Sequence, residues 1–194
     1  LRGVKGTSVN IKIYRKGNNR LLDFNIIRDD IPLYSIEASF ILTNDIGYIK
    51  INRFSATTYK EFEEGANKLT NLGMKKLVLD LRGNPGGYLG DVIKMCDEML
   101  EKNNLIVYTK GRNRERENVY ATSNGNLKET EIIILINEGS ASASEIVSGA
   151  IQDNDRGIVI GRRSFGKGLV QEQINLNDGS AIRITTQRYY TPAG

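Results

Sequence analysis

The order of hydrophobic and polar residues along the chain predicts strands that alternate with helices. The run Ile132 to Ile136 is continuously apolar and too short for a membrane span, which is typical of a buried strand. The run Leu77 to Leu79 is also continuously apolar, as expected of a strand covered on both faces. Strands and helices alternate between Tyr48 and Ile160, and this order predicts an α/β fold.

The remaining elements follow from the same periodicities and from the turn residues between them. Strands are predicted at residues 9–13, 22–26, 35–42, 48–51, 105–108, 157–161, 169–176 and 181–189. Helices are predicted from 57 or 58 to 72, from about 89 to 100, and from the serine-rich stretch that opens at 140. The first helix is expected to end at Gly73, and residues 113–128 are expected to form a polar loop.

The stretch from Ser140 to Ser144 joins the buried strand to the last predicted helix. A serine at such a turn has its hydroxyl at a helix N-terminus, beside backbone N–H groups that can stabilise an oxyanion. Serines at this position also serve as ordinary helix caps. Position alone therefore leaves both roles open, a nucleophile and a cap.

The chain contains no histidine, so a serine nucleophile here would need another base. Lys167 lies between two glycines, and apolar residues flank this group: Phe165, Leu169 and Val170. A lysine in place of histidine is the Ser-Lys form of nucleophilic catalysis. Because the lysine must be neutral to accept a proton, we expect burial among these neighbours to disfavour its ammonium form.

A second turn, Arg82 to Gly87, follows the strand at 77–79 and contains three glycines and a proline. Such a turn can bring bare backbone N–H groups close to a ligand. Nucleotide binding is disfavoured, because neither a Gly-Lys-Ser/Thr sequence nor G-x-G-x-x-G is present.

Composition narrows the possible functions further. The 194 residues, of which 39% are hydrophobic, suffice for one core with at most a small appendage. The net charge is +4, and acidic residues interrupt the basic cluster at 110–116, so we interpret this cluster as a solvated loop and expect no nucleic-acid partner. With no histidine and a single cysteine, Cys96, neither a zinc site nor a disulfide within the chain is expected, and no cofactor is implied.

Several separated motifs resemble the carboxy-terminal processing, or tail-specific, serine proteases. The signature G-S-A-S-A-S-E of that family is present from Gly139 to Glu145. The resemblance extends to 47–49, 79–87 and 189–194, with two departures: Ser164 stands where threonine is usual, and Gly83 where asparagine is common.

The resemblance implies a catalytic role for three side chains. Ser142 matches the nucleophile, Lys167 lies 25 residues further along and matches the general base, and Gln171 matches the residue that orients the lysine. The family also builds an oxyanion hole from two backbone amides. One would be the amide of Ala143, and the other would be the amide of Gly86 or Gly87. The sequence spacing does not distinguish between these two glycines.

The family fold implied is α/β, with the spiral ββα core shared with Clp protease and crotonase. In the family, a hairpin like that predicted near the N-terminus closes a PDZ domain, so residues 1–28 are expected to be a PDZ remnant, although an edge hairpin of the main sheet is the alternative. Residues 29–194 would form the catalytic core, truncated at its C-terminal end.

The resemblance predicts an endopeptidase that acts on proteins or peptides with apolar C-termini, exported to the bacterial periplasm or cell envelope. Contact with a membrane would come only through segments outside this sequence. The rival hypothesis is a non-catalytic module on the same fold that binds an apolar ligand or a peptide. Retention of Ser142, Lys167 and Gln171 together favours the protease.

Overall fold

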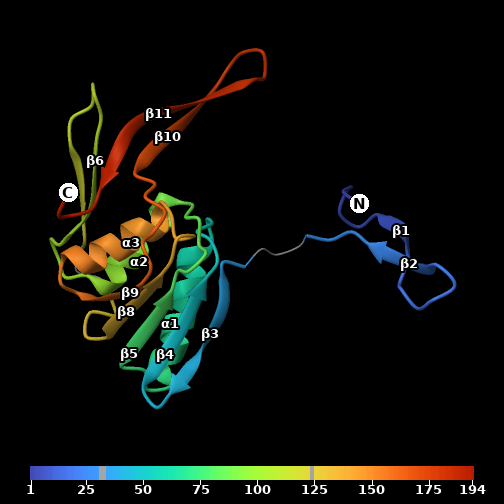
Figure 1. The fold of residues 1–194 in the computed structure, drawn as a ribbon, viewed down its shortest axis with the longest axis horizontal. Coiled ribbons are helices and arrows are strands. Elements are labelled where there is room, and N and C mark those ends of the chain that lie inside the picture. The colour runs from blue at the N-terminus through green and yellow to red at the C-terminus, as the bar shows by residue number, and fades with distance from the viewer. Residues whose placement is uncertain (31–33, 123–124) are drawn as a thin grey trace. The chain divides into compact units, whose positions relative to one another are not determined.

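A computed structural model describes residues 1–30, 34–122 and 125–194 (Figure 1). The chain divides into two compact units, Leu1–Leu33 and Tyr34–Gly194. We call them the hairpin unit and the core unit. Residues 31–33, which the sequence prediction assigned to the catalytic core, lie outside the described residues.

The hairpin unit contains two antiparallel strands, β1 (Ser8–Ile13) and β2 (Leu22–Ile27). Apolar side chains of β2 remain exposed to solvent, with exposed fractions of 41% for Phe24, 46% for Ile26 and 69% for Ile27. An isolated two-stranded hairpin is marginally stable at best in water. The exposed apolar surface of β2 is therefore the kind of surface that further structure normally covers.

The core unit is built around a five-stranded sheet with the strand order β3-β4-β5-β8-β9. β4, β5, β8 and β9 run parallel, and β3 is antiparallel to β4. The strands are β3 (Ile36–Thr43), β4 (Ile46–Ile51), β5 (Lys76–Asp80), β8 (Glu131–Ile136) and β9 (Gly157–Gly161). This arrangement confirms the α/β prediction.

Three helices pack together and against the strands of the core unit (Figure 1). They are α1 (Thr58–Asn71), α2 (Leu89–Met99) and α3 (Ala143–Asp153). Alternate residues of the three central strands are at most 2% exposed and belong to one hydrophobic core with the helices: Ile49, Ile51, Leu77, Leu79, Ile132 and Ile134. Because side chains alternate along a strand, this set defines the face of the sheet that the helices cover.

A second sheet has the strand order β10-β11-β6-β7, and in Figure 1 its long β10-β11 hairpin extends away from the helices. Its strands are β6 (Leu105–Lys110), β7 (Glu117–Tyr120), β10 (Leu169–Asn175) and β11 (Ala181–Tyr190). The prediction of a polar loop over 113–128 was wrong at β7, which pairs with β6 in an antiparallel register. β7 has only Val119 packed against the core, so its sequence lacks an apolar alternation. Residues 123 and 124 of that predicted loop lie outside the described residues.

A buried carboxylate stands at the end of β5, where the chain enters the glycine-rich turn. Asp80 is completely buried and accepts hydrogen bonds from the Tyr48 hydroxyl at 2.7 Å and from the Arg82 guanidinium at 2.6 and 2.9 Å. Burial acts to raise the pKa of Asp80, but the hydrogen bonds from Arg82 and Tyr48 outweigh it and lower the pKa to about 2. The ionised carboxylate therefore fixes the start of this turn.

We predict that Asp80 contributes to the stability of the core unit above about pH 4 and that this contribution is lost as the pH falls toward about 2. The free energy of unfolding falls with the pH because the pKa of Asp80 is lower in the folded state than in the unfolded chain, so protonation favours unfolding. Between about pH 5 and about pH 3, urea unfolding should show the wild type losing about 1 kcal/mol more than Asp80→Asn. Equal losses in the two proteins would contradict this role.

Candidate active site

The two predicted loops of the site follow neighbouring parallel strands and meet at one edge of the sheet. β5 leads into the turn 82–87, and β8 leads into the turn 137–142 before α3. Two contacts join the turns: the Gly83 N–H donates to the side chain of Asn137 at 2.8 Å, and the Ala141 N–H donates to the Asn84 carbonyl at 3.0 Å. The carboxyl ends of parallel strands are the usual place for a site in α/β sheets.

Ser142 stands at the start of α3 in a backbone conformation that L-residues rarely adopt, with φ 53° and ψ −110°. Its N–H donates to the Glu145 carboxylate at 2.8 Å, and the two residues form a capping box at the start of α3. Strained backbone at a strand-to-helix turn costs free energy and persists where the surrounding structure enforces it, commonly at functional sites. Ser142 therefore combines a partly exposed side chain with a strained backbone at the first turn of the helix.

The other two serines of the motif have structural contacts. Ser140 and Ser144 are both completely buried, while Ser142 is partly exposed. The Ser140 hydroxyl donates to the Leu81 carbonyl at 2.8 Å, and the Ser144 hydroxyl donates to the Asn84 carbonyl at 2.9 Å. The cluster thus divides into two buried hydroxyls, bonded to Leu81 and to Asn84 of the glycine-rich turn, and one accessible hydroxyl.

The glycine-rich turn approaches the Ser142 turn so closely that a side chain cannot be accommodated at Gly86. A Cβ there would lie 2.6 Å from the Ala141 carbonyl oxygen, and its φ of 94° also favours glycine. The Gly86 N–H donates to the Asn84 side chain at 2.9 Å, so it is already paired. Within the described residues, the N–H groups of Gly87 and Ala143 have no acceptor.

Asn84 is a residue of the site to which the sequence prediction gave no role. It is completely buried; its side chain donates to the Ile51 carbonyl at 2.9 Å and accepts from Gly86, while its carbonyl accepts from Ala141 and Ser144. Through its side chain and its carbonyl, this one residue thus connects the end of β4, the glycine-rich turn and the Ser142 turn.

Lys167 lies on the segment between β9 and β10 and lines the same two cavities as Ser142. Among the residues described here, no hydrogen bond joins its amine to the Ser142 hydroxyl. The expected burial was wrong: Lys167 is exposed, and the exposed fractions of Phe165 and Leu169 are 68% and 40%. These neighbours in sequence do not enclose the lysine, because their own side chains extend into solvent.

The two cavities differ in chemistry and have Ser142, Lys167 and Tyr189 in common. One, of about 240 Å³, has apolar walls that include Val107 and Ile146. The other, of about 270 Å³, is polar, and its lining includes the remaining predicted site residues Gln171 and Gly87. The β10-β11 register shifts between Val170 and Gln171, and such a bulge changes the direction in which side chains point.

Glu145 connects the Ser142 turn to the lysine segment. One carboxylate oxygen accepts from the Ser164 hydroxyl at 2.7 Å and from the Gly166 N–H at 2.6 Å, and the other accepts from the N–H groups of Ser142 and Lys167, both at 2.8 Å. In the sequence, Glu145 was distinguished only as the last residue of the G-S-A-S-A-S-E motif. An acidic residue three positions after a serine at a helix start is the signature of a capping box, and this was the available signal.

The comparisons with known proteins show the family and the fold of the chain. The family model described as Peptidase family S41 matches residues 45–194, which is more than half of the chain. The chain belongs to peptidase family S41.

Curated members of the family match the whole chain. A carboxy-terminal-processing protease of Bartonella bacilliformis is 41% identical over 199 residues, covering 100% of this chain and 45% of the relative. The carboxy-terminal processing protease CtpB of Bacillus subtilis is 37% identical over 196 residues, covering 100% of this chain and 41% of the relative. The chain thus spans less than half the length of these curated relatives.

The solved structures agree in fold. A photosystem II D1 C-terminal processing protease aligns with 99% of this chain and 53% of its own, at a TM-score of 0.75 and 27% identity. A putative S41 protease from Bacteroides fragilis shares the fold at a TM-score of 0.71 and 15% identity, over 95% of this chain and 54% of that one. The α/β core thus has the Clp protease/crotonase-like fold that the sequence predicted.

We predict that Glu145→Gln loosens the lysine segment from α3. A glutamine side chain has one acceptor oxygen and cannot accept all four hydrogen bonds. Amide hydrogen exchange at Gly166 and Lys167 should accelerate about 10-fold, the effect of losing about 1.4 kcal/mol of protection.

The matched control is Glu138→Gln. Glu138 is also an acid of the 137–145 stretch, but its carboxylate binds the exposed Arg162 and no amide of the lysine segment. Exchange at Gly166 and Lys167 should remain at the wild-type rate in this variant. Unchanged exchange in Glu145→Gln as well would show that the carboxylate does not hold the segment.

Proposed function

We propose that this chain carries the catalytic centre of a serine endopeptidase that cleaves proteins near their C-termini. Ser142 attacks the scissile carbonyl carbon, and Lys167 accepts the hydroxyl proton and then delivers it to the leaving amine. Water hydrolyses the resulting acyl-enzyme, with Lys167 again as the base. Gln171 orients the lysine side chain.

The observation that supports this proposal most strongly is the difference between the three serines. Ser140 and Ser144 are buried and donate to the carbonyls of Leu81 and Asn84, whereas Ser142 is partly exposed, has a strained backbone and lines both cavities together with Lys167. Ser142 also shares a capping box with Glu145, but the other two serines line neither of these cavities. This contrast favours Ser142 as the nucleophile.

The hydrogen-bond pattern favours Gly87 over Gly86 as the second donor to the oxyanion. The Gly86 N–H is paired with the Asn84 side chain, and the Gly87 N–H has no acceptor within the described part of the chain. Gly87 also lines the polar cavity with Ser142. We therefore assign the oxyanion hole to the N–H groups of Ala143 and Gly87, with Gly86 as the residue that permits the close approach of the two turns.

The lysine mechanism requires a local movement. Lys167 must bring its amine within hydrogen-bond reach of the Ser142 hydroxyl and must be neutral when it does so. Glu145 already fixes the backbone of Lys167 to the N–H of Ser142 through one oxygen, so only the side chain has to turn. A bound substrate that covers the two cavities would exclude water and disfavour the ammonium form.

The apolar cavity next to Ser142 supports a preference for substrates with apolar tails. Its walls include Val107, Ile146 and Thr191, which suit an aliphatic side chain beside the scissile bond. The names of the curated relatives, carboxy-terminal processing proteases, describe the same class of reaction.

We propose further that the hairpin unit is the closing part of a PDZ domain. Its exposed apolar residues in β2 are consistent with a sheet that continues into further structure. Limited proteolysis of the full-length protein would test this: a protected domain should end near residue 28, and cleavage within β1 or β2 would contradict it.

An exported location, in the periplasm or cell envelope, follows from the family resemblance and is likewise a proposal. In the described residues, no helix has the length and apolar character needed to cross a membrane. Fractionation of cells expressing the full-length protein tests the location, and recovery in the cytoplasmic fraction alone would contradict it.

We predict that Ser142→Ala lowers kcat/KM for an apolar-tailed peptide at least about 1,000-fold while leaving the unfolding midpoint within error. Ser144→Ala should keep most of the activity and lose about 1 kcal/mol of stability, because it removes one buried hydrogen bond. Ser148→Ala is the control on the same helix for activity and should leave kcat/KM unchanged, because among the described residues the Ser148 hydroxyl donates only to the Glu145 carbonyl, at 3.2 Å. An inactive Ser144→Ala beside an active Ser142→Ala would move the nucleophile to Ser144.

We predict that Lys167→Arg is as inactive as Lys167→Ala, with losses of about 100- to 10,000-fold in kcat. A guanidinium keeps a cation at this position but cannot accept a proton. Gln171→Ala should show a smaller loss, because it leaves the base in place. An active Lys167→Arg would exclude the lysine as general base, and complete inactivity of the wild type would favour a binding module.

A further inference from the structure

The β10-β11 hairpin presents a polar face to the cavity that contains Ser142. Gln171, Gln173 and Arg183 all line this cavity, and Gln173 lies directly opposite Arg183 in the antiparallel register. Two apolar residues of the hairpin, Ile174 and Ile182, are paired with each other one position away, on the opposite face. The hairpin thus turns amide groups and one guanidinium toward the nucleophile.

Arg183 brings a positive charge to this cavity that no carboxylate neutralises. The lining residues of the cavity include neither aspartate nor glutamate. In the parts of the chain that the structure describes, Arg183 forms no ion pair, while Arg82, Arg114 and Arg162 each bind a carboxylate. The acid nearest in the register, Glu172, is bound to Arg114 and Thr186.

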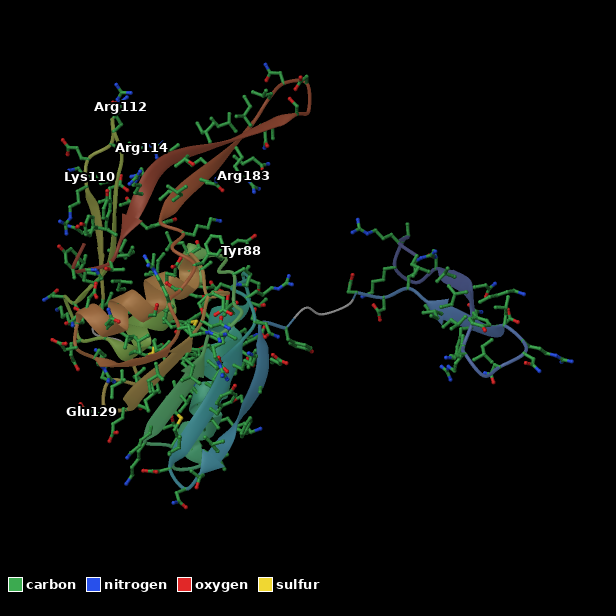
Figure 2. All side chains as sticks on the ribbon, viewed as in Figure 1. Tyr88, Lys110, Arg112, Arg114, Glu129 and Arg183 are labelled. Carbon is green, nitrogen blue, oxygen red and sulfur yellow. The ribbon has the colours of Figure 1, made fainter. Side chains whose placement is uncertain are left out.

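Figure 2 shows Arg183 on the arm of the hairpin and Tyr88 on the core unit beneath that arm. Tyr88 follows Gly87, the glycine that lines the same cavity as Arg183. A peptide lying over Ser142 between this loop and the hairpin would therefore pass the guanidinium.

We propose that Arg183 is a specificity determinant that binds a carboxylate of the substrate, on the side of the scissile bond away from the apolar cavity. This inference rests on the proposed peptidase function and adds a substrate class to it. The carboxylate is either an acidic side chain or the free C-terminus of a short tail, since both offer the planar pair of oxygens that a guanidinium binds.

The expected effect is moderate because Arg183 is exposed. Solvent weakens the attraction between two exposed charges, whereas a charge-assisted hydrogen bond between the same groups strengthens it. We expect carboxylate-bearing peptides to be preferred about 5- to 10-fold in kcat/KM, and the preference to decline as salt is raised.

The test uses three peptides with the same apolar residue before the scissile bond. The first has glutamine after the bond and an amidated C-terminus, the second replaces that glutamine with glutamate, and the third keeps the glutamine but ends in a free carboxylate. Preference for the second identifies a side-chain carboxylate, and preference for the third identifies a terminal one. Equal rates for all three peptides would overturn the inference.

Three variants of the 194-residue chain connect the preference to Arg183. Arg183→Gln should reduce the preference to about 1, and Arg183→Glu should instead favour a peptide with lysine at the tested position. Arg188→Gln is the matched control, because Arg188 is an exposed arginine on the same strand that lines a different cavity with Lys110. A preference that survives in Arg183→Gln, or is lost equally in Arg188→Gln, would overturn the assignment.

A binding measurement separates this inference from the proposed function. In the Ser142→Ala background, the fluorescence anisotropy of the labelled peptides reports affinity without turnover. The preferred carboxylate peptide should bind about 5- to 10-fold more tightly than the neutral one, and adding Arg183→Gln should remove the difference. If the unmodified chain cleaved none of the peptides and this difference persisted, the peptidase proposal would fail while the carboxylate site stood. Equal affinities would overturn the site.

Discussion

The carboxylate of Glu145 holds together the two segments on which the proposed chemistry depends. The proposed nucleophile belongs to the turn after β8, and the proposed base belongs to a segment after β9 that has no regular secondary structure of its own. Three hydrogen bonds from that segment and one from the Ser142 N–H, of 2.6 to 2.8 Å, meet at this one carboxylate. Because each bond joins a donor to an ionised acceptor, this contact is stronger than a set of neutral hydrogen bonds.

Buried polar groups likewise fix the position of the glycine-rich turn relative to Ser142. Asn84, Ser140 and Ser144 are completely buried, and together they join the ends of β4 and β5 to the turn before α3. Removing such a group leaves a buried partner unpaired, which costs more than the hydrogen bond itself contributes. The candidate site therefore has a half held by buried hydrogen bonds, which includes the Ser142 turn and the glycine-rich turn, and an exposed half, which includes Lys167 and the hairpin.

Sequence patterns predicted most of the core, because hydrophobic periodicity reports burial directly. The runs Leu77 to Leu79 and Ile132 to Ile136 became β5 and β8, and glycine ended α1 at Gly73 as expected. β7 was missed because its pairing with β6 depends on tertiary contacts rather than on its own polar sequence. The exposure of Lys167 was missed for a related reason, since apolar neighbours in sequence do not determine which side chains surround a residue in space.

The candidate site was identified by family spacing rather than by physical derivation, and the structure adds the contacts that spacing cannot give. The choice between Gly86 and Gly87 needed the pairing of each N–H, and the role of Glu145 needed the position of a segment about 20 residues further along the chain.

Mapping the site of covalent modification tests the central claim most directly. After treatment with a fluorophosphonate and proteolytic digestion, mass spectrometry should locate a single adduct on Ser142. An adduct on Ser140 or Ser144, or an unmodified chain under conditions where it is folded, would contradict the account.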